Sequence, residues 1–325
     1  GNNIISRLSW QKTSDGQRNE KPALMLCAHI DTVAPCEGYS FDPYTPDYAT
    51  AAEVISTKIS KGESPEAPAA SVNESEIVAG LGSNDDGASV VSMIAAYRFF
   101  CETLSTATNL TLVLTCEEER SGKGGMTGLW GKRLSQIDYA IVGEPTGMKA
   151  ATSERGLLVI DATAHGVSGH AARNEGKNAL YIALEDIERL RKHEFAKVAP
   201  KMGKVNLNVT QINAGSAHNV IPDRCDFVID IRPTEQYSNE EILHELQEIC
   251  ESELKPRNLA NRSSATHEDS PLQKTADDMG IETFSSATTS DWMRITCDAI
   301  KMGPGDSNRS HRKDEYVTVE ELKEG

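Results

Sequence analysis

The sequence lacks the long apolar run that a membrane helix needs, and it has fewer basic than acidic residues. No stretch of its 325 residues approaches the roughly 20 consecutive apolar residues of a transmembrane helix, so no membrane span is expected. Lys and Arg total 33 against 49 Asp and Glu, which gives a net charge of −16. A chain this acidic repels phosphate backbones, so nucleic-acid binding is not expected either.

Cysteine pairs at metal-binding spacing are also absent. The 7 cysteines include no CxxC pair, and several lie within apolar runs. This argues against a disulfide framework and a cysteine metal site, and it favours reduced thiols in a cytoplasmic protein. No signal peptide is apparent, and the chain begins at Gly1 rather than Met. We therefore expect the natural N-terminus to be missing, and the C-terminus to be truncated inside a final helix.

Apolar segments suited to buried strands alternate with a helical segment in the first part of the chain. Strands are predicted at 23–28, 110–115 and 139–143, and the apolar spacing from Ala88 to about Cys101 predicts a helix. This order is typical of an α/β fold in which a mostly parallel sheet is covered by helices on both faces. In such sheets ligands bind beyond the carboxyl ends of the strands.

Three stretches of the first part have a weaker pattern. Residues 1–11 suggest an edge strand, and 14–21 suggest a polar turn. The stretch 45–76 lacks clear periodicity, and its latter part is rich in Ser, Glu, Pro and Ala. We therefore expect a surface insertion or flexible loop there.

A change of pattern after about residue 151 indicates a second domain. Strand, helix, strand, strand and helix follow in that order, at 157–163, 178–195, 205–212, 225–231 and from a capping box at 238–241 to about Leu254. This order predicts a small α+β sandwich with an antiparallel sheet. We expect residues 152–267 to be inserted into a first domain formed by 1–151 and 268–325. That domain resumes with a helix at 271–279 and a last strand at 299–302.

The first predicted internal strand leads directly into His29 and Asp31. Residues two apart on a strand point to the same face, so the two side chains are expected side by side. A carboxylate can hold one ring nitrogen of a histidine and leave the other free for a metal. Taken alone, such a pair is more often a surface or turn feature.

Further polar groups follow the other strands or open the first helix. Glu118 and Glu119 follow the second internal strand, Glu144 follows the third, and Asp85 precedes the helix. Each has an ordinary alternative: a solvated acidic face, a loop carboxylate or a helix N-cap. His311, much further along the chain, is by itself best read as a surface histidine.

Together, two histidines and three carboxylates are what two divalent ions need if one carboxylate is shared. Imidazole and carboxylate ligands suit Zn²⁺, and also Co²⁺ or Mn²⁺. Each ion would hold one His, one terminal Glu and one oxygen of the shared carboxylate, which leaves a position open for water. Glu118, adjacent to a ligand, is then the natural general base for that water.

These segments resemble the motifs of the dinuclear zinc deacylase family. That family contains acetylornithine deacetylase, succinyl-diaminopimelate desuccinylase, carboxypeptidase G and the tripeptide and Xaa-His aminopeptidases. The matching segments are, in order, HIDTV at 29–33, GSNDDG at 82–87, EEE at 117–119, GEPT at 143–146 and GPG at 303–305 followed by His311. The resemblance covers nearly the whole chain. It implies a zinc-exopeptidase-like fold with an inserted lid or dimerisation domain, and hence a homodimer.

The resemblance also implies ligand sets for two zinc ions that share Asp85. His29 and Glu144 would complete one set, and Glu119 and His311 the other. Cobalt or manganese remains possible in place of zinc.

Other matching positions carry roles beyond metal binding. Glu118 matches the family's general base, and Asp31 matches the carboxylate that orients the first histidine. His170, in the GHAAR segment at 169–173, matches a histidine that reaches the partner subunit's active site to stabilise the oxyanion. The peptide bond between Asp85 and Asp86 is expected to be cis.

Four residues are candidates for binding the substrate carboxylate. Arg232 and Asn219 match lid positions, and Thr289 matches a catalytic-domain segment that closes over the substrate. The guanidinium of Arg232 can donate two parallel hydrogen bonds to a carboxylate, although a structural ion pair would use the same donors equally well. Arg155 is a weaker candidate for the same task.

The function implied is removal of the acyl group from an N-acyl amino acid, with N-acetylornithine or N-succinylornithine as first choice, in arginine biosynthesis. Asn84 and the segment 117–122 are most similar to the acetylornithine deacetylase branch of Bacteroidetes type, while many relatives have Asp-x-Lys-Gly where this chain has Asp85-Asp86-Gly87. Succinyl-diaminopimelate desuccinylase and dipeptidase or carboxypeptidase activities are the alternatives within the family. A catalytically inactive binding subunit is a further alternative. A nucleotide-binding protein is disfavoured because its phosphate loop would carry two Asp.

Overall fold

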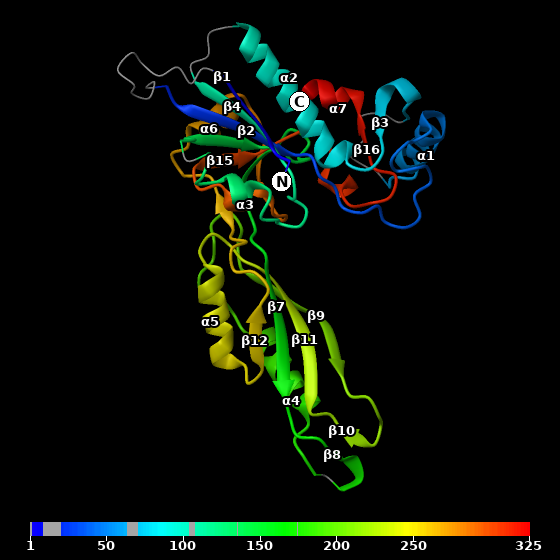
Figure 1. The fold of residues 1–325 in the computed structure, drawn as a ribbon, viewed down its shortest axis with the longest axis vertical. Coiled ribbons are helices and arrows are strands. Elements are labelled where there is room, and N and C mark those ends of the chain that lie inside the picture. Colours follow the sequence, from blue (N-terminus) through cyan, green and yellow to red (C-terminus); the bar gives the residue numbers. More distant parts are fainter. Residues whose placement is uncertain (1, 9–20, 64–70, 104–107, 135, 174) are drawn as a thin grey trace. The chain divides into compact units, whose positions relative to one another are not determined.

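A computed structural model of the chain describes residues 2–8, 21–63, 71–103, 108–134, 136–173 and 175–325 (Figure 1). The chain divides into two compact units. The first comprises Gly1–Thr152, Ala265–Phe284 and Ser290–Gly325, and the second comprises Ser153–Ser264 and Ser285–Thr289. The polar turn predicted at 14–21 lies almost entirely outside the described residues.

The first unit is built on a mostly parallel sheet, as the sequence predicts. Its strand order is β1-β4-β2-β5-β15-β6-β13, with β14 also pairing with β6. The central strands β4, β2, β5 and β15 run parallel, whereas β1 is an antiparallel edge strand. The bounds are β1 Ile4–Leu8, β2 Ala23–His29, β4 Asn109–Thr115, β5 Tyr139–Val142, β6 Ala150–Glu154, β13 Ser264–Ala265, β14 Thr283–Ser286 and β15 Asp298–Lys301.

Both faces of this sheet are buried. Successive residues of β2 point to opposite faces, and each face packs against other elements. Leu26 packs in a cluster with Met93 and Tyr97 of α2 (Ala88–Thr103). Met25 packs on the other face in a cluster with Met126 of α3 (Met126–Leu129) and Trp292. Helix α6 (Pro271–Asp278) covers β15 through Ala276. This two-sided burial explains why the strands read as nearly continuous apolar runs.

The stretch 45–76, where a surface insertion or flexible loop is expected, contains a helix. Helix α1 (Tyr48–Ser60) begins at an N-cap, Asp47, and strand β3 (Ile77–Ala79) pairs with β16 (Tyr316–Thr318) beside it (Figure 1). The buried face of α1 is narrow, consisting of Ala51, Ala52 and Ile55, and it packs in a cluster with Phe41 and Tyr316. Because part of this cluster, Tyr316, comes from near the end of the given sequence, local periodicity gives little sign of the packing. Residues 64–70 lie outside the part that the structure describes.

The second unit is an α+β sandwich with a four-stranded antiparallel sheet in the order β12-β7-β11-β9. The strands are β7 Leu158–His165, β9 Asn206–Ala214, β11 Arg224–Arg232 and β12 Glu253–Pro256, with helices α4 Ala179–Lys192 and α5 Asn239–Ile249 and a separate pair β8 Gly169–His170 and β10 Val220–Ile221. The helix expected to reach about Leu254 ends at Ile249, since Cys250 is extended and Leu254 belongs to β12.

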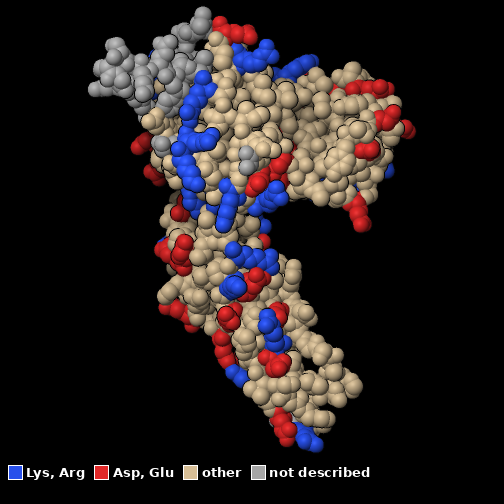
Figure 2. Space-filling view, in the orientation of Figure 1, with Lys and Arg blue, Asp and Glu red and all other residues tan. Residues whose placement is uncertain are grey.

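One face of this sheet forms the core with the two helices, and the other carries charged pairs. Phe227 and Ile229 of β11 belong to the buried cluster that includes Ala183 of α4 and Leu246 of α5. Acidic and basic side chains lie close to one another on the part of the surface in Figure 2 that corresponds to this unit. Arg257 pairs with Asp161 at 2.7 Å and Arg224 with Asp226 at 2.7 Å. Exposed pairs of this kind add little stability.

The chain ends in helix α7 (Val319–Glu324), capped by Thr318. Within the described ranges, the longest apolar helical stretch falls short of what crossing a membrane requires.

A buried carboxylate joins α4 to the turn that follows α5. Asp186 of α4 accepts hydrogen bonds from the backbone N–H groups of Glu251 (3.0 Å) and Ser252 (2.8 Å), from the Ser252 hydroxyl, and from Arg189. Its side chain is fully buried. We expect Asp186→Ala to lower the free energy of unfolding by about 2–4 kcal/mol, because two backbone N–H groups lose their partner. Urea unfolding followed by circular dichroism measures this loss.

The matched control is Glu185→Ala on the exposed side of the same helix. Glu185 pairs with Arg189 at 3.4 Å, and its side chain is 69% exposed. Its replacement should change the unfolding free energy by less than about 0.5 kcal/mol. Equal losses in the two variants would contradict the role given to Asp186.

Candidate metal centre

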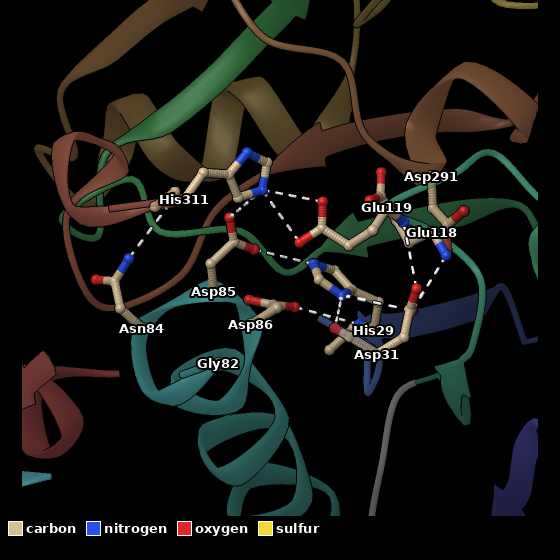
Figure 3. Close-up of polar contacts among 12 residues, drawn as sticks. His29, Asp31, Gly82, Asn84, Asp85, Asp86, Glu118, Glu119, Asp291 and His311 are labelled. Carbon is tan, nitrogen blue, oxygen red and sulfur yellow. Dashed lines mark hydrogen bonds and ion pairs between the residues drawn. The ribbon is translucent and has the colours of Figure 1, made fainter. Parts of the chain in front are cut away.

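Polar residues gather where the parallel strands of the first unit end. His29 is the last residue of β2, Glu118 and Glu119 follow β4, and Glu144 follows β5. Asp85 lies in the turn that opens α2 (Figure 3). Since parallel strands deliver their carboxyl ends to the same edge of the sheet, residues distant in sequence meet there.

Asp85 lies between the two histidines. Its Oδ1 is 3.0 Å from Nε2 of His29, and its Oδ2 is 3.7 Å from Nε2 of His311. His311 also faces Glu119, with 2.9 Å between Nε2 and Oε2 (Figure 3). Ligand atoms of His29, Asp85 and Glu119 all lie within 4.8 Å of one another. One carboxylate therefore presents one oxygen to each imidazole, as a shared ligand must.

The turn that carries Asp85 has an unusual backbone. It begins after Gly82, whose φ of 75° favours glycine, and an added Cβ there would lie 2.3 Å from Cγ2 of Thr32. The peptide bond between Asp85 and Asp86 is cis, as the family resemblance implied. The side chain of Asn84 fastens the turn to a later loop: its Oδ1 accepts from the Asp306 N–H at 2.9 Å, and its Nδ2 donates to the Asp306 carbonyl at 3.1 Å.

Asp31 faces His29 with both its main chain and its side chain. Nδ1 of His29 is 2.9 Å from the backbone carbonyl oxygen of Asp31, while the nearest carboxylate oxygen is 3.7 Å away. The carboxylate also accepts hydrogen bonds from the backbone N–H groups of Glu118 (3.1 Å) and Glu119 (3.3 Å) (Figure 3). Asp31 thus orients the histidine mainly through its main chain and fixes the acidic turn after β4 through its side chain.

Negative charge is concentrated in this site. Burial raises the pKa of Glu118 well above its usual range; His29 opposes the shift, and Asp291 and Glu119 add to it. Burial likewise raises the pKa of Glu144, with Asp85 adding to the shift and Lys301 opposing it. These mutual influences place Glu144 in the same electrostatic environment as Asp85.

The carboxylates of the site raise the pKa values of both histidines. A hydrogen bond with Glu119 raises the pKa of His311, whose side chain is about half exposed. Burial alone would lower the pKa of His29, but its hydrogen bond with Asp85 and the nearby carboxylates outweigh burial and raise it well above the usual value. Both imidazoles therefore face an environment that favours a positive charge.

The donor set fits divalent metal ions. Imidazole nitrogens and carboxylate oxygens are ligands that Zn²⁺ and similar ions take. Burying this many carboxylates together is costly unless cations compensate them. Asp86 adds a buried carboxylate oxygen, Oδ1, without a hydrogen-bond partner in the described structure.

Two acidic residues of the site were not assigned roles from the sequence. Asp291 is buried, accepts a hydrogen bond from the Thr115 hydroxyl at 2.6 Å, and has its pKa raised by burial to about 6. Asp86 is buried beneath His29, whose backbone N–H lies 3.3 Å from its Oδ2. The signal for Asp291 was its place two residues after Thr289, at the end of a segment already marked by the resemblance.

The remaining predicted residues belong to the second unit. His170 is exposed on β8, and Asn219 directly precedes β10. The Asn219 carbonyl accepts from the Ala171 N–H, and Nδ1 of His170 accepts from the Ala172 N–H at 3.2 Å. Thr289, in the segment Ser285–Thr289, is half-buried.

The two arginines proposed for substrate binding already have partners. Arg232 makes a forked pair with Asp230, at 2.8 Å and 3.2 Å. Arg155 donates to the backbone carbonyls of Lys204, Arg232 and Met202. Arg155 thus connects segments of its own unit, and its terminal nitrogens are engaged there.

The second unit matches the profile of a known family. Residues 152–258 match the family described as the peptidase dimerisation domain. The fold as a whole resembles solved structures, including an aminopeptidase PepT from Bacillus cereus (TM-score 0.70, 16% identity, covering 99% of this chain and 81% of that one). Another is a dinuclear metal-binding peptidase of the M20 family from Bacillus subtilis (TM-score 0.63, 12% identity, 99% and 81%). These comparisons show a peptidase dimerisation domain in the second unit and a fold shared with M20 peptidase structures.

Curated relatives narrow the comparison. The acetylornithine deacetylase of Myxococcus xanthus is 28% identical over 233 residues, which are 66% of this chain and 61% of the relative. That of Proteus mirabilis is 25% identical over 320 residues, 91% of this chain and 75% of the relative. The succinyl-diaminopimelate desuccinylase of Xanthomonas campestris is 25% identical over 328 residues, 93% and 80%. The match thus spans about three fifths of the Myxococcus relative and more of the other two.

Proposed function

We propose that the chain is a metal-dependent hydrolase of amide bonds. The observation that carries this proposal is the position of Asp85, with one carboxylate oxygen toward His29 and the other toward His311, beside the buried Glu118. The match to the peptidase dimerisation domain and the deacetylase and desuccinylase names of similar proteins support the same class of reaction.

Two divalent ions would be held by residues that share Asp85. His29 and Glu144 would bind one ion, and Glu119 and His311 the other, with zinc as the first choice and cobalt or manganese as substitutes. When bound, such ions lower the pKa of a water molecule and polarise the substrate carbonyl.

Glu118 would move the protons. It follows the same strand as the ligand Glu119, and the carboxylate of Asp31 fixes its backbone. In the proposed reaction it takes a proton from the attacking water and later delivers it to the nitrogen of the leaving amine. A buried carboxyl with a raised pKa is suited to both transfers.

The second unit would serve as a lid and dimerisation domain, formed by residues 152–267. In this proposal His170 of the partner subunit donates to the oxyanion, while Arg232, Asn219 and Thr289 contact the substrate carboxylate. The exposed position of His170 on the β8–β10 pair suits a residue that acts on another molecule.

The role of His170 across subunits predicts an unusual complementation. Alone, His170→Ala should lower kcat about 10²–10³-fold, as loss of one oxyanion donor does. Co-expressed with Glu118→Gln, it forms mixed dimers in which one site keeps Glu118 of its own chain and His170 of the other. With random pairing, roughly a quarter of wild-type activity should return. If His170 acted within its own chain, the mixture would stay inactive, because neither site would be complete.

N-acetylornithine or N-succinylornithine is the proposed substrate, within arginine biosynthesis in the cytoplasm. Support comes from the acetylornithine deacetylases among the relatives, at low identity. Succinyl-diaminopimelate desuccinylase is the second candidate, because such a relative matches 93% of this chain.

A substrate panel tests the assignment. The purified protein is assayed with N-acetylornithine, N-succinylornithine, N-succinyl-diaminopimelate and dipeptides, after loading with Zn²⁺, Co²⁺ or Mn²⁺ and after removal of metal by a chelator. We expect turnover of an ornithine derivative that disappears on chelation and returns with metal. If neither ornithine derivative is hydrolysed, the first-choice substrate is wrong. Binding of metal without turnover of any substrate would favour an inactive binding subunit.

A further inference from the structure

The turn that presents Asp85 is fastened by one buried side chain from the end of the chain, Glu315. Its Oε1 accepts hydrogen bonds from the backbone N–H groups of Asn84 (3.0 Å) and Asp85 (2.9 Å). Its Oε2 accepts from the N–H of Gly82 at 3.0 Å. A single carboxylate therefore satisfies three N–H donors of the turn that opens α2. Hydrogen bonds from N–H groups to a charged acceptor are stronger than neutral ones.

Strand pairing delivers Glu315 to this position. It directly precedes β16, whose Tyr316 pairs with Ala79 of β3. The Glu315 carbonyl accepts from Gly80, the first residue after β3, at 2.9 Å. Glu315 is only 2% exposed, so water does not compete for its hydrogen bonds. Main chain and side chain of the same residue thus fix both ends of the segment that leads from β3 to Asp85.

The segment held in this way is the one on which both halves of the site depend. Figure 3 shows Gly82, Asn84 and Asp85 along the turn above α2, with His29 and His311 facing Asp85. A displacement of Asp85 would move both of its carboxylate oxygens together. Glu144 and Glu119, by contrast, each follow a different strand and would each serve one ion.

We propose that Glu315 is a positioning residue for the shared metal ligand, so that its three hydrogen bonds to the turn set the affinity for both ions at once. This inference rests on the proposed function. Residues that hold metal ligands in place typically change metal affinity by about 10–100-fold when they are replaced.

The test is Glu315→Gln, which keeps the size of the side chain but turns one acceptor into an NH₂ group that faces an N–H. Affinities for Zn²⁺ and Co²⁺ are measured by competition with a chromophoric chelator, without substrate. We expect both binding steps to weaken about 10–100-fold. Glu315→Asp, which keeps the charge but shortens the side chain, should give an intermediate loss.

Glu321→Gln is the matched control. Glu321 is also a carboxylate near the end of the chain; it caps α7 through Thr318 and pairs with Arg309 at 2.8 Å, but it does not contact the Asp85 turn in any described contact. Both variants should lower the melting temperature of the metal-free protein, and only Glu315→Gln should weaken metal binding. Equal metal affinities in the two variants would overturn the inference.

A second measurement covers the case in which Glu315→Gln does not fold. In the metal-free wild-type protein, the amides of Gly82, Asn84 and Asp85 should exchange slowly with deuterium, because they donate to a buried carboxylate. Exchange at the rate of an open loop would overturn the inference. If the wild type binds two ions and Glu315→Gln binds them with the same affinity, this inference alone is refuted. If the wild type binds no ion, the proposed function is refuted, and this inference with it.

Discussion

Replacing Glu118 by Gln should lower kcat by about 10²–10⁴-fold, the contribution that general acid–base catalysis makes. The upper end is expected because the same carboxyl would act in two proton transfers. Gln keeps the size and the polar character of the side chain, so the fold and the ligands around it remain. Steady-state kinetics with the preferred substrate measure the loss, and elemental analysis should still find two metal ions per chain.

The control is Glu117→Gln, one residue earlier. The Glu117 carboxylate turns away from the ligands and accepts a hydrogen bond from the Gly124 N–H at 3.0 Å. An amide oxygen can replace that acceptor, so kcat should change no more than a few-fold. A residual activity in Glu118→Gln close to wild type, with full metal content, would remove Glu118 from the proton-transfer role.

Replacing Asp85 by Asn should have the largest effect on metal content. An amide has one good ligand oxygen, whereas Asp85 presents an oxygen to each histidine. We expect the metal content to fall from two ions per chain to one or none, and turnover to fall below detection. Inductively coupled plasma mass spectrometry after dialysis against metal-free buffer measures the metal content per chain.

Asp314→Asn is the matched control for Asp85. Asp314 has a fully buried side chain and pairs with Lys58 at 2.7 Å, near His311 in sequence but on the side of α1. Its replacement should lower the free energy of unfolding and leave two ions bound. Retention of two tightly held ions by Asp85→Asn would show that the carboxylate is not shared between them.

The sequence predicted the part of the site that depends on local order. Apolar strands that end in polar residues are visible without a structure, and parallel strands must bring those ends together. This is why His29, Glu119 and Asp85 could be grouped from sequence, and they lie within 4.8 Å of one another in the fold. The order of strands and helices along the sequence also predicted the mostly parallel sheet and the inserted second unit.

What the sequence did not predict depends on partners far away along the chain. The stretch that contains α1 was expected to be a surface insertion or flexible loop, because the buried face of the helix is only three residues wide and Tyr316 in its cluster comes from β16. The carboxylate of Asp31 lies 3.7 Å from Nδ1 of His29, as expected, but it also accepts hydrogen bonds from two backbone N–H groups, and such contacts have no sequence signature. Arg232 and Asp230 share a face of β11, and that spacing could have indicated their pairing.

The hydrogen bond between Glu315 and Asp85 joins residues 230 positions apart. At about 5–20 residues per second, a ribosome needs roughly 10–50 s to add that much chain. During this interval the nascent protein already contains His29, Asp85 and Glu119, but neither His311 nor the side chain that holds the turn. Four of the five proposed ligands are therefore translated early, and His311 is translated late. In the proposed centre, the turn that carries Asp85 can be held only after Glu315 has been added and β16 has paired with β3.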